Sequence, residues 1–299
     1  MRIVVLGSAA GGGVPQWNCR CDVCRLAWEG DPRVAHRTQS SLAATVDGDR
    51  WLLVNASPDL RQQIASTPEL QPRGRSRGSP IGAVLLTNGD VDHVAGLLTL
   101  RERQPFALYA TAATLAAIAA NPVFGVLAPD VVERRPISLD AGFEPLPGLA
   151  ATLVAVPGKA PLWAEGAEPE IGASGETTVG VVLEAGGRRL AYIPGCARVS
   201  PALRERLRGV DALLFDGTVH RDDELIRTGV GTKTGWRMGH VAMAGEEGSI
   251  ARLDGLGIGR RVFVHLNNTN PALVDGSPER RAVEAAGWTV AHDGMVLEP

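Results

Sequence analysis

The chain has 299 residues, enough to bury a full core, and a formal net charge of −3. This balance leaves no broad basic surface for nucleic acid and no polybasic membrane anchor, and no run approaches the ~20 apolar residues of a membrane span. The opening MRIVVLG predicts a strand that enters a glycine turn and has no signal-peptide pattern, so we expect a soluble cytoplasmic protein.

A glycine-rich loop, GSAAGGGVPQW, follows the first strand at residues 2–6. The loop resembles one that cradles a phosphate, but Pro15 comes next and no helical pattern follows. A tight loop whose backbone closely approaches a neighbouring group is therefore favoured over a dinucleotide site.

Three of the four cysteines, Cys19, Cys21 and Cys24, fall within six residues. This spacing is too tight for mutual disulfides and suits three thiolates that converge on one soft cation such as Zn²⁺. The sequence predicts a structural zinc site, with reduced thiols lining a loop as the alternative. Cys196, isolated after an apolar strand, is interpreted as a small buried residue.

The first half then alternates strands and helices. Residues 40–46 and 51–55 flank Asp47-Gly48-Asp49, which predicts a hairpin. A short helix is expected at 58–65. Further along, the pattern predicts a strand at 106–109, a helix at 111–120, and strands at 131–141 and 149–156.

Between these elements lies AVLLTNGDVDHVAGLLTL, residues 83–100. Its apolar start predicts a buried strand and Val94 onward a helix, so its polar cluster falls on a strand-to-helix loop, where α/β folds place their chemistry. The cluster consists of Asn88, Asp90, Asp92 and His93. Crowded carboxylates and an imidazole cost desolvation unless a cation or hydrogen bonds hold them, which favours a metal site. A helix N-cap with a solvated histidine is the alternative.

The second half repeats the alternation, with a hairpin at 177–193, a helix at 201–207 and another at 248–255. The apolar strand VDALLFD ends on Asp216, and the last strand, RVFVHL, carries His265. Both polar residues stand where a strand ends, like Asp92 and His93. We therefore expect the three strand ends to converge.

These residues resemble the metallo-β-lactamase superfamily. TNGDVDHVAGL is similar to its His-x-His-x-Asp-His metal motif, LLFDGT supplies the bridging acid and VFVHLNNTNP the terminal histidine. Over residues 1–299, GSAAGGGVPQWNCRCDVC, GTKTGWRMGH and HLNNTNP resemble the pyrroloquinoline quinone (PQQ) biosynthesis protein B family. The resemblance implies one α/β domain over 1–299, a four-layered αβ/βα sandwich of two mixed sheets with helices outside and the metal at one sheet edge.

The resemblance implies one metal position held by Asp92, His93, Asp216 and His265. The superfamily's second position departs from the pattern, because Asn88 and Asp90 replace its first two histidines and Lys159 follows the strand where a third would stand. An amide is a weak ligand and a lysine repels a cation. We therefore expect one tightly held metal rather than a hydrolytic pair.

One metal with open coordination positions suits a non-haem Fe(II) centre that activates O₂, whereas two metals suit hydrolysis. The family acts in the pathway that makes PQQ from a peptide's cross-linked Glu and Tyr, where the tyrosine ring must be hydroxylated. The resemblance thus predicts an iron-dependent hydroxylase, an oxygenase, with Zn²⁺ as the alternative ion. His240 and Asp90 are the catalytic candidates, although His240 could equally be a structural loop histidine.

The predicted substrate carries carboxylates, which a charge-assisted hydrogen bond can orient. The cations we expect in that role are Lys159, Lys233 and Arg237, with solvated surface charges as the alternative. The fourth zinc ligand is expected from the segment after His265, as Asn268 or Asn270. Two other classes stay open, a metal-dependent hydrolase that recruits Asp90 and a carrier or transport protein for the quinone or its precursor. The oligomeric state is also open, with a homodimer as one alternative.

Overall fold

A computed structural model describes residues 1–74, 76–166 and 170–299. These residues form two seven-stranded sheets. The first sheet has the order β14 (Val296–Leu297), β1 (Arg2–Gly7), β2 (Ser41–Thr45), β3 (Trp51–Val54), β4 (Ile81–Leu85), β5 (Phe106–Ala110) and β6 (Val132–Pro136). The second has the order β13 (Thr289–Val290), β12 (Arg260–Val264), β11 (Ala212–Asp216), β10 (Arg188–Ile193), β9 (Ala173–Ala185), β8 (Leu149–Gly158) and β7 (Gly142–Leu146).

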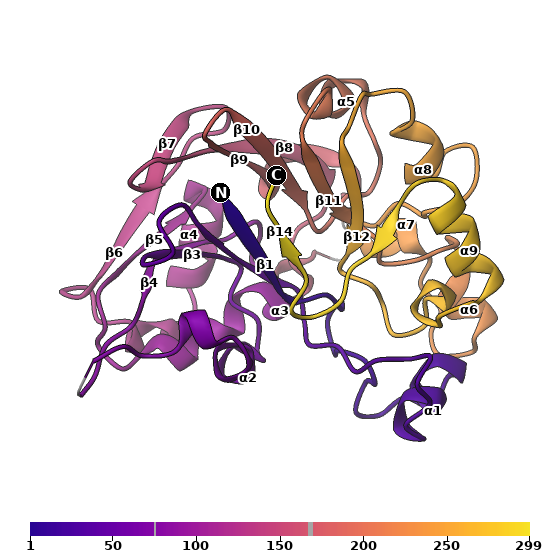
Figure 1. Cartoon of the computed structure of the whole chain (residues 1–299), viewed down its shortest axis with the longest axis horizontal. Coiled ribbons are helices and arrows are strands. Elements are labelled where there is room, and N and C mark those ends of the chain that lie inside the picture. The colour runs from indigo at the N-terminus through magenta and orange to yellow at the C-terminus, as the bar shows by residue number, and fades with distance from the viewer. Residues whose placement is uncertain (75, 167–169) are drawn as a thin grey trace.

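Both sheets are mixed. The pairs β3–β4, β4–β5 and β5–β6 are parallel in the first sheet, as are β10–β11, β11–β12 and β12–β13 in the second, and the remaining pairs are antiparallel. The last strand, β14, pairs with β1, so the two ends of the chain lie near each other in Figure 1. The carboxyl ends of the parallel strands meet at one edge, where a ligand site is expected.

Helices connect the strands. The α-helices are α1 (Asp22–Trp28), α2 (Leu60–Ser66), α3 (Val91–Val94), α4 (Ala112–Ala119), α5 (Pro201–Leu207), α6 (Glu224–Arg227), α7 (Gly235–Met238), α8 (Ser249–Arg252) and α9 (Pro278–Ala285). Short 3₁₀ helices are η1 (Pro68–Leu70), η2 (Ala95–Leu100), η3 (Pro122–Val126), η4 (Leu162–Ala164) and η5 (Pro271–Leu273). None of the helices in the described ranges has the length and apolar character needed to cross a membrane.

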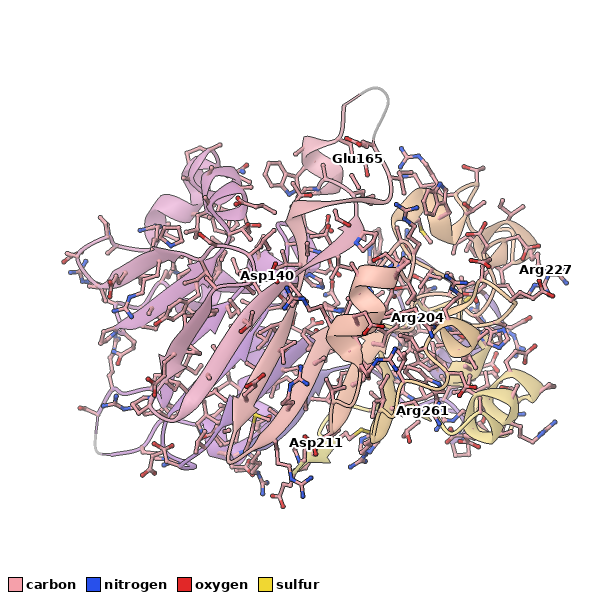
Figure 2. The ribbon with its side chains drawn as sticks, turned by 90° about the horizontal axis from the view of Figure 1, so that it is seen from above. Asp140, Glu165, Arg204, Asp211, Arg227 and Arg261 are labelled. Atoms are coloured by element: carbon pink, nitrogen blue, oxygen red, sulfur yellow. The ribbon has the colours of Figure 1, made fainter. Side chains whose placement is uncertain are left out.

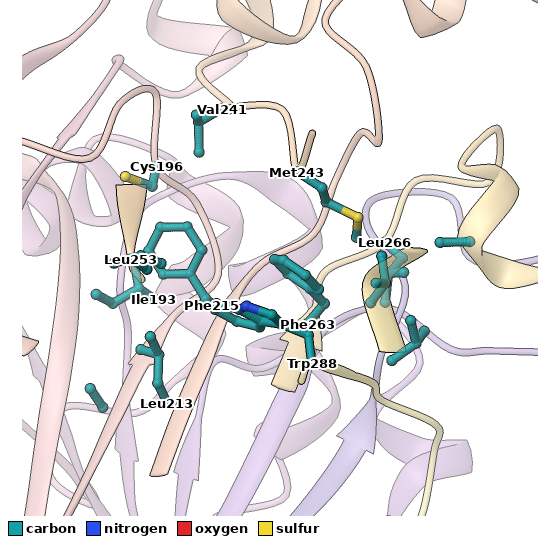
Figure 3. Packing of buried hydrophobic residues seen from close by; sticks show 14 of the residues in the cluster. Ile193, Cys196, Leu213, Phe215, Val241, Met243, Leu253, Phe263, Leu266 and Trp288 are labelled. Atoms are coloured by element: carbon teal, nitrogen blue, oxygen red, sulfur yellow. The ribbon is translucent and has the colours of Figure 1, made fainter. Parts of the chain in front are cut away.

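Three apolar clusters lie between four layers, because successive side chains of a strand point to opposite faces of a sheet. In β12, Val262 and Val264 join the cluster that contains residues of both sheets, whereas Phe263 joins the cluster beneath α5, α8 and α9. Phe263 stacks on Trp288 there, with ring centroids 4.1 Å apart (Figure 3). A third cluster lies under α2 and α4. The predicted four-layered sandwich of two mixed sheets with helices outside is therefore confirmed.

One predicted strand is wrong. Residues 131–141 do not form a single strand, because β6 ends at Pro136 and β7 begins at Gly142 in the other sheet. Pro136 has no backbone N–H to extend the pairing, and Asp140 adopts a positive φ of 61° that turns the chain. The apolar pattern alone does not distinguish a long strand from two strands joined by a turn.

Candidate functional site

The loop after β4 carries Asp92 and His93 into the site and is attached to the end of β3. The His93 carbonyl accepts the Ala56 N–H at 2.7 Å, and the Ala56 carbonyl accepts the Gly96 N–H at 2.8 Å. A Cβ at position 96 would lie 2.1 Å from the carbonyl oxygen of Ser57, so only glycine permits this approach. The first turn of α3 is thereby fixed, and with it both side chains.

The orientation of His93 is set by Asn88. Its Nδ1 lies 2.7 Å from Oδ1 of Asn88, and the same Oδ1 accepts the Asp90 N–H at 3.0 Å, which identifies that atom as the amide oxygen. An acceptor at Nδ1 places the proton there and leaves a lone pair on Nε2. That Nε2 is buried and has no hydrogen-bond partner within the described part of the chain. It is an orphaned polar atom that a cation would satisfy.

His265 faces the same point from the end of β12. Its Nε2 lies 3.1 Å from Oδ2 of Asp92, and that carboxylate oxygen is 3.7 Å from Nε2 of His93. The three side chains each offer one ligand atom, and these atoms lie within 4.8 Å of one another. Two imidazoles and one carboxylate thus converge, and their donor set fits a divalent transition metal.

The charge state of these groups also suits a cation. Burial acts to raise the pKa of Asp92, but His93 and His265 outweigh it and lower that pKa, so the carboxylate stays ionised. Burial lowers the pKa of His93, which keeps its imidazole neutral. For His265 burial acts in the same direction, yet the hydrogen bond and charge of Asp92 outweigh it and raise the pKa. A metal would replace the proton that this pair shares.

Asp216 lies beside His240 and accepts hydrogen bonds from two further groups. Its Oδ2 accepts from the Cys196 N–H at 2.9 Å and lies 2.8 Å from Nδ1 of His240, while Oδ1 accepts the Thr218 hydroxyl at 2.7 Å. Asp216 therefore forms a second group with His240 and His265, which stack at 5.1 Å between ring centroids, and is not in the group of Asp92 and His93. The two groups share His265, and the binding of all four predicted residues to one metal stays a prediction.

Thr218 links the two groups and was not singled out from the sequence. Its Oγ1 lies 2.8 Å from Nδ1 of His265 and 3.0 Å from Nδ1 of His240. An oxygen at Nδ1 of His265 leaves Nε2 to face Asp92 and a metal. The available sequence signal was the position of Thr218, two residues after the carboxylate that ends β11.

The three cysteines converge as predicted from their spacing, with their sulfur atoms within 4.8 Å of one another. The Asn268 side-chain nitrogen lies 3.2 Å from Sγ of Cys19, 3.2 Å from Sγ of Cys24 and 3.7 Å from Sγ of Cys21. The Cys21 thiol beside Cys24 lowers the pKa of Cys24 to about 5. A thiolate is thus already favoured in a site whose sulfur ligands suit Zn²⁺.

Of the two candidates for a fourth ligand, Asn268 is the one whose side chain lies beside the sulfurs, where its amide nitrogen donates to them, and its role as a ligand stays a prediction. Asn270 instead donates to the Gly217 carbonyl at 2.8 Å and accepts the Ala272 N–H at 2.9 Å. Its side-chain amide therefore caps the start of η5. In Figure 1, α1 lies away from the first sheet and beside the C-terminal half. Val23 of α1 shares an apolar cluster with Val283 of α9. A zinc here would join the N-terminal loop to the segment after β12.

The three cationic side chains predicted to bind the substrate lie in two different places. Lys159 and Arg237 lie together on Glu165, with Nζ of Lys159 at 2.7 Å and Nη2 of Arg237 at 3.1 Å from its carboxylate oxygens. Lys233 is exposed, and no hydrogen bond or ion pair with another described residue involves it. Asp90, the other catalytic candidate, occupies the N-cap position of α3.

A cleft with a volume of about 950 Å³ has His240 in its wall. Its walls include Arg198, Trp236 and Glu246. The His240 side chain is 17% exposed, whereas that of Asp216 behind it is fully buried. His240 is thus the residue through which the inner histidines meet this cleft.

Comparisons with known proteins agree with this architecture. The beta-lactamase superfamily domain matches residues 50–266. Coenzyme PQQ synthesis protein B of Methylorubrum populi is 67% identical over 298 residues, covering 100% of both chains. The protein of that name from Rhizobium meliloti is 54% identical, covering 99% of this chain and 97% of its own.

Solved structures are similar as well. The crystal structure of Zn(2+)-bound PqqB from Methylobacterium extorquens matches with a TM-score of 0.99 and 67% identity, covering 100% of both chains. A diphosphatase from the PhnP family matches with a TM-score of 0.71 and 24% identity, covering 99% of this chain and 97% of its own. The latter likeness concerns the fold alone.

Proposed function

The chain belongs to the coenzyme PQQ synthesis protein B family, and we propose that it acts in the synthesis of that coenzyme as an iron-dependent hydroxylase. Its substrate is the cross-linked Glu-Tyr precursor, and the reaction adds one oxygen atom to the tyrosine ring. The remaining oxygen atom of O₂ leaves as water, so the reaction also consumes two electrons from a reductant.

The observation that carries this proposal is the group of Asp92, His93 and His265. Two histidines and one carboxylate with open positions form the ligand set typical of non-haem Fe(II) oxygenases. A bound Fe²⁺ supplies accessible redox chemistry toward O₂, which the filled d shell of Zn²⁺ does not. Imidazole and carboxylate ligands accept either Fe²⁺ or Zn²⁺, so the two ions must be compared directly.

The imidazole of His240 can accept a proton from the tyrosine ring of the substrate. The Nδ1 of His240 lies 2.8 Å from the buried Asp216 carboxylate, which orients the imidazole. That arrangement leaves the Nε2 of His240 as the basic atom. We place the phenol hydroxyl against it, so that His240 accepts the hydroxyl proton as the ring gains electron density.

The test loads the protein anaerobically with either Fe²⁺ or Zn²⁺, adds the cross-linked Glu-Tyr amino acid and ascorbate, and then admits ¹⁸O₂. We expect product with one labelled oxygen in the iron-loaded protein only. Equal product with zinc would contradict the proposal. Tight binding without turnover under either metal would instead identify a carrier of the quinone or its precursor.

One observation favours a hydrolase as the second candidate. Asp216, His240 and His265 form another group with ligand spacing, and two adjacent metals are typical of hydrolytic centres. If two equivalents of Zn²⁺ bind outside the cysteine site and the protein has phosphodiesterase or esterase activity, it is a hydrolase and not a hydroxylase.

A further inference from the structure

Glu165, labelled in Figure 2, is a nearly buried carboxylate on the connection between β8 and β9. Its side chain is 7% exposed and contacts two cations, Nζ of Lys159 at 2.7 Å and Nη2 of Arg237 at 3.1 Å. The Lys159 side chain is 13% exposed. The Arg237 side chain is 37% exposed. Ion pairs on the surface contribute little, but an ammonium as little exposed as that of Lys159 needs an anion beside it. Glu165 provides that anion from within the chain.

The two cations lie beside the metal-binding groups. Arg237 belongs to α7, three residues before His240. A Cβ at position 239 would lie 3.1 Å from Cγ of Lys159, so the lysine side chain passes directly over the backbone that precedes His240. The other end of Lys159 is fixed, because its carbonyl accepts the Thr178 hydroxyl at 3.0 Å.

The same connection also touches the loop of Asp92 and His93. The Trp163 indole N–H donates to the Gly89 carbonyl at 2.9 Å, and Thr178 forms an isolated β-bridge with Asn88. The connection that carries Glu165 therefore contacts both the segment before His240 and the loop before Asp92. Trp236, the neighbour of Arg237 in the chain, lines the cleft at His240.

Glu165 does not use every donor of this pair. Nη1 of Arg237 is buried and has no hydrogen-bond partner among the residues that the structure describes. A guanidinium presents its N–H groups as a planar fork that matches a carboxylate through two bonds, whereas Glu165 is bonded through Nη2 alone. A buried donor left unpaired is costly, and a better-placed carboxylate would satisfy it.

We propose that Lys159 and Arg237 form a carboxylate-binding subsite and that Glu165 occupies it until a carboxylate of the substrate replaces it. This inference rests on the proposed function in one respect, since it takes the substrate to be an amino acid with free carboxylates. The exchange conserves the charge of the subsite, because one carboxylate leaves the two cations as another arrives. A neutral ligand that displaced Glu165 would leave both cations without an anion, so the subsite selects acids.

The experiment measures binding of the cross-linked Glu-Tyr amino acid to zinc-loaded protein by calorimetry, without O₂. Glu165→Gln keeps the shape of the side chain but removes the competing charge, and we expect binding to tighten about tenfold, the scale of one charge-assisted hydrogen bond. In the Glu165→Gln background, Lys159→Met and Arg237→Met should each weaken binding about tenfold or more. The compound with its carboxylates methylated should show none of these changes.

Glu170→Gln is the matched control, since Glu170 is an exposed carboxylate on the same connection. Thermal melting and zinc content verify that each variant is folded and loaded. Unchanged or weaker binding by Glu165→Gln would overturn the inference, as would an equal gain in Glu170→Gln or with the methylated compound. The hydroxylase proposal fails separately, by absence of oxygenated product from iron-loaded protein, so the two failures are distinguishable.

Discussion

The amide oxygen of Asn88 lies 2.7 Å from Nδ1 of His93, at the sequence position where the metallo-β-lactamase motif would have its first histidine. Asn88 therefore has a role of its own at this position. It orients the imidazole that we propose as a metal ligand, because the acceptor at Nδ1 leaves Nε2 to face Asp92 and His265. In that proposal, Asn88 stands at a ligand position of the superfamily motif and acts as the partner of a ligand.

The first prediction follows from this contact. Replacing Asn88 by Ala removes the acceptor at Nδ1 and should lower the affinity of the active-site metal about 10- to 100-fold, the usual effect of losing such an outer partner. Competition with a chelator measures the change. Asn88→Asp keeps an acceptor oxygen and should recover most of the affinity. Wild-type affinity in Asn88→Ala would show that His93 is held by other contacts.

The second prediction separates the two metal sites. His265 adopts a φ of +57°, a left-handed conformation that asparagine tolerates better than most residues, so His265→Asn removes the imidazole with little backbone strain. We expect one equivalent of bound metal to be lost and the cysteine-bound zinc to stay. Metal content by mass spectrometry checks this. The exposed His292→Asn serves as control, and equal metal loss in both variants would contradict the assignment.

The convergence of the strand ends could be predicted because it depends on local patterns. Asp92, Asp216 and His265 each follow an apolar run, and the ends of parallel strands meet at one sheet edge. The spacing of Cys19, Cys21 and Cys24 likewise predicts that their sulfurs converge, because a chain this short limits their separation. These features required no knowledge of side-chain orientation.

The division of the site into two groups could not be predicted in this way. It depends on which way the Asp216 carboxylate turns, and that is decided by the nearby Thr218 hydroxyl together with the Cys196 N–H, which the fold brings in from another segment. Glu165 was missed for a similar reason. It lies in a polar loop with no motif, and only the fold brings it onto Lys159 and Arg237.

The third prediction concerns the cysteine site. Cys21→Ser should abolish zinc binding there and lower the melting temperature, because the site joins the loop before α1 to Asn268. If free zinc is one hundred times its Kd, the lost linkage alone is about 2.7 kcal/mol. Cys196→Ala removes a cysteine outside the cluster and should retain this zinc. A full zinc complement in Cys21→Ser would disprove the site.

The last prediction uses Glu224, a buried carboxylate behind the site. Its Oε1 accepts the Thr269 hydroxyl at 2.6 Å and its Oε2 accepts the His220 N–H at 2.7 Å. Burial outweighs these bonds and raises the pKa of Glu224 to about 7 from an ordinary value of 4.5. Between these two values the folded chain keeps a proton that the unfolded chain has released, so the free energy of unfolding falls as the pH rises.

Glu224→Gln removes this titration while keeping the shape and one acceptor oxygen. Between pH 5 and pH 8 the free energy of unfolding of the variant, relative to wild type, should therefore rise by about 2 to 3 kcal/mol. Denaturant unfolding of zinc-loaded protein at both pH values measures it, and the comparison with wild type cancels the other titrating groups. Glu246→Gln, at an exposed position, should show no such change. A difference between Glu224→Gln and wild type that is the same at both pH values would mean that Glu224 is ionised in the folded protein throughout this range, held by the hydroxyl and the amide that contact it.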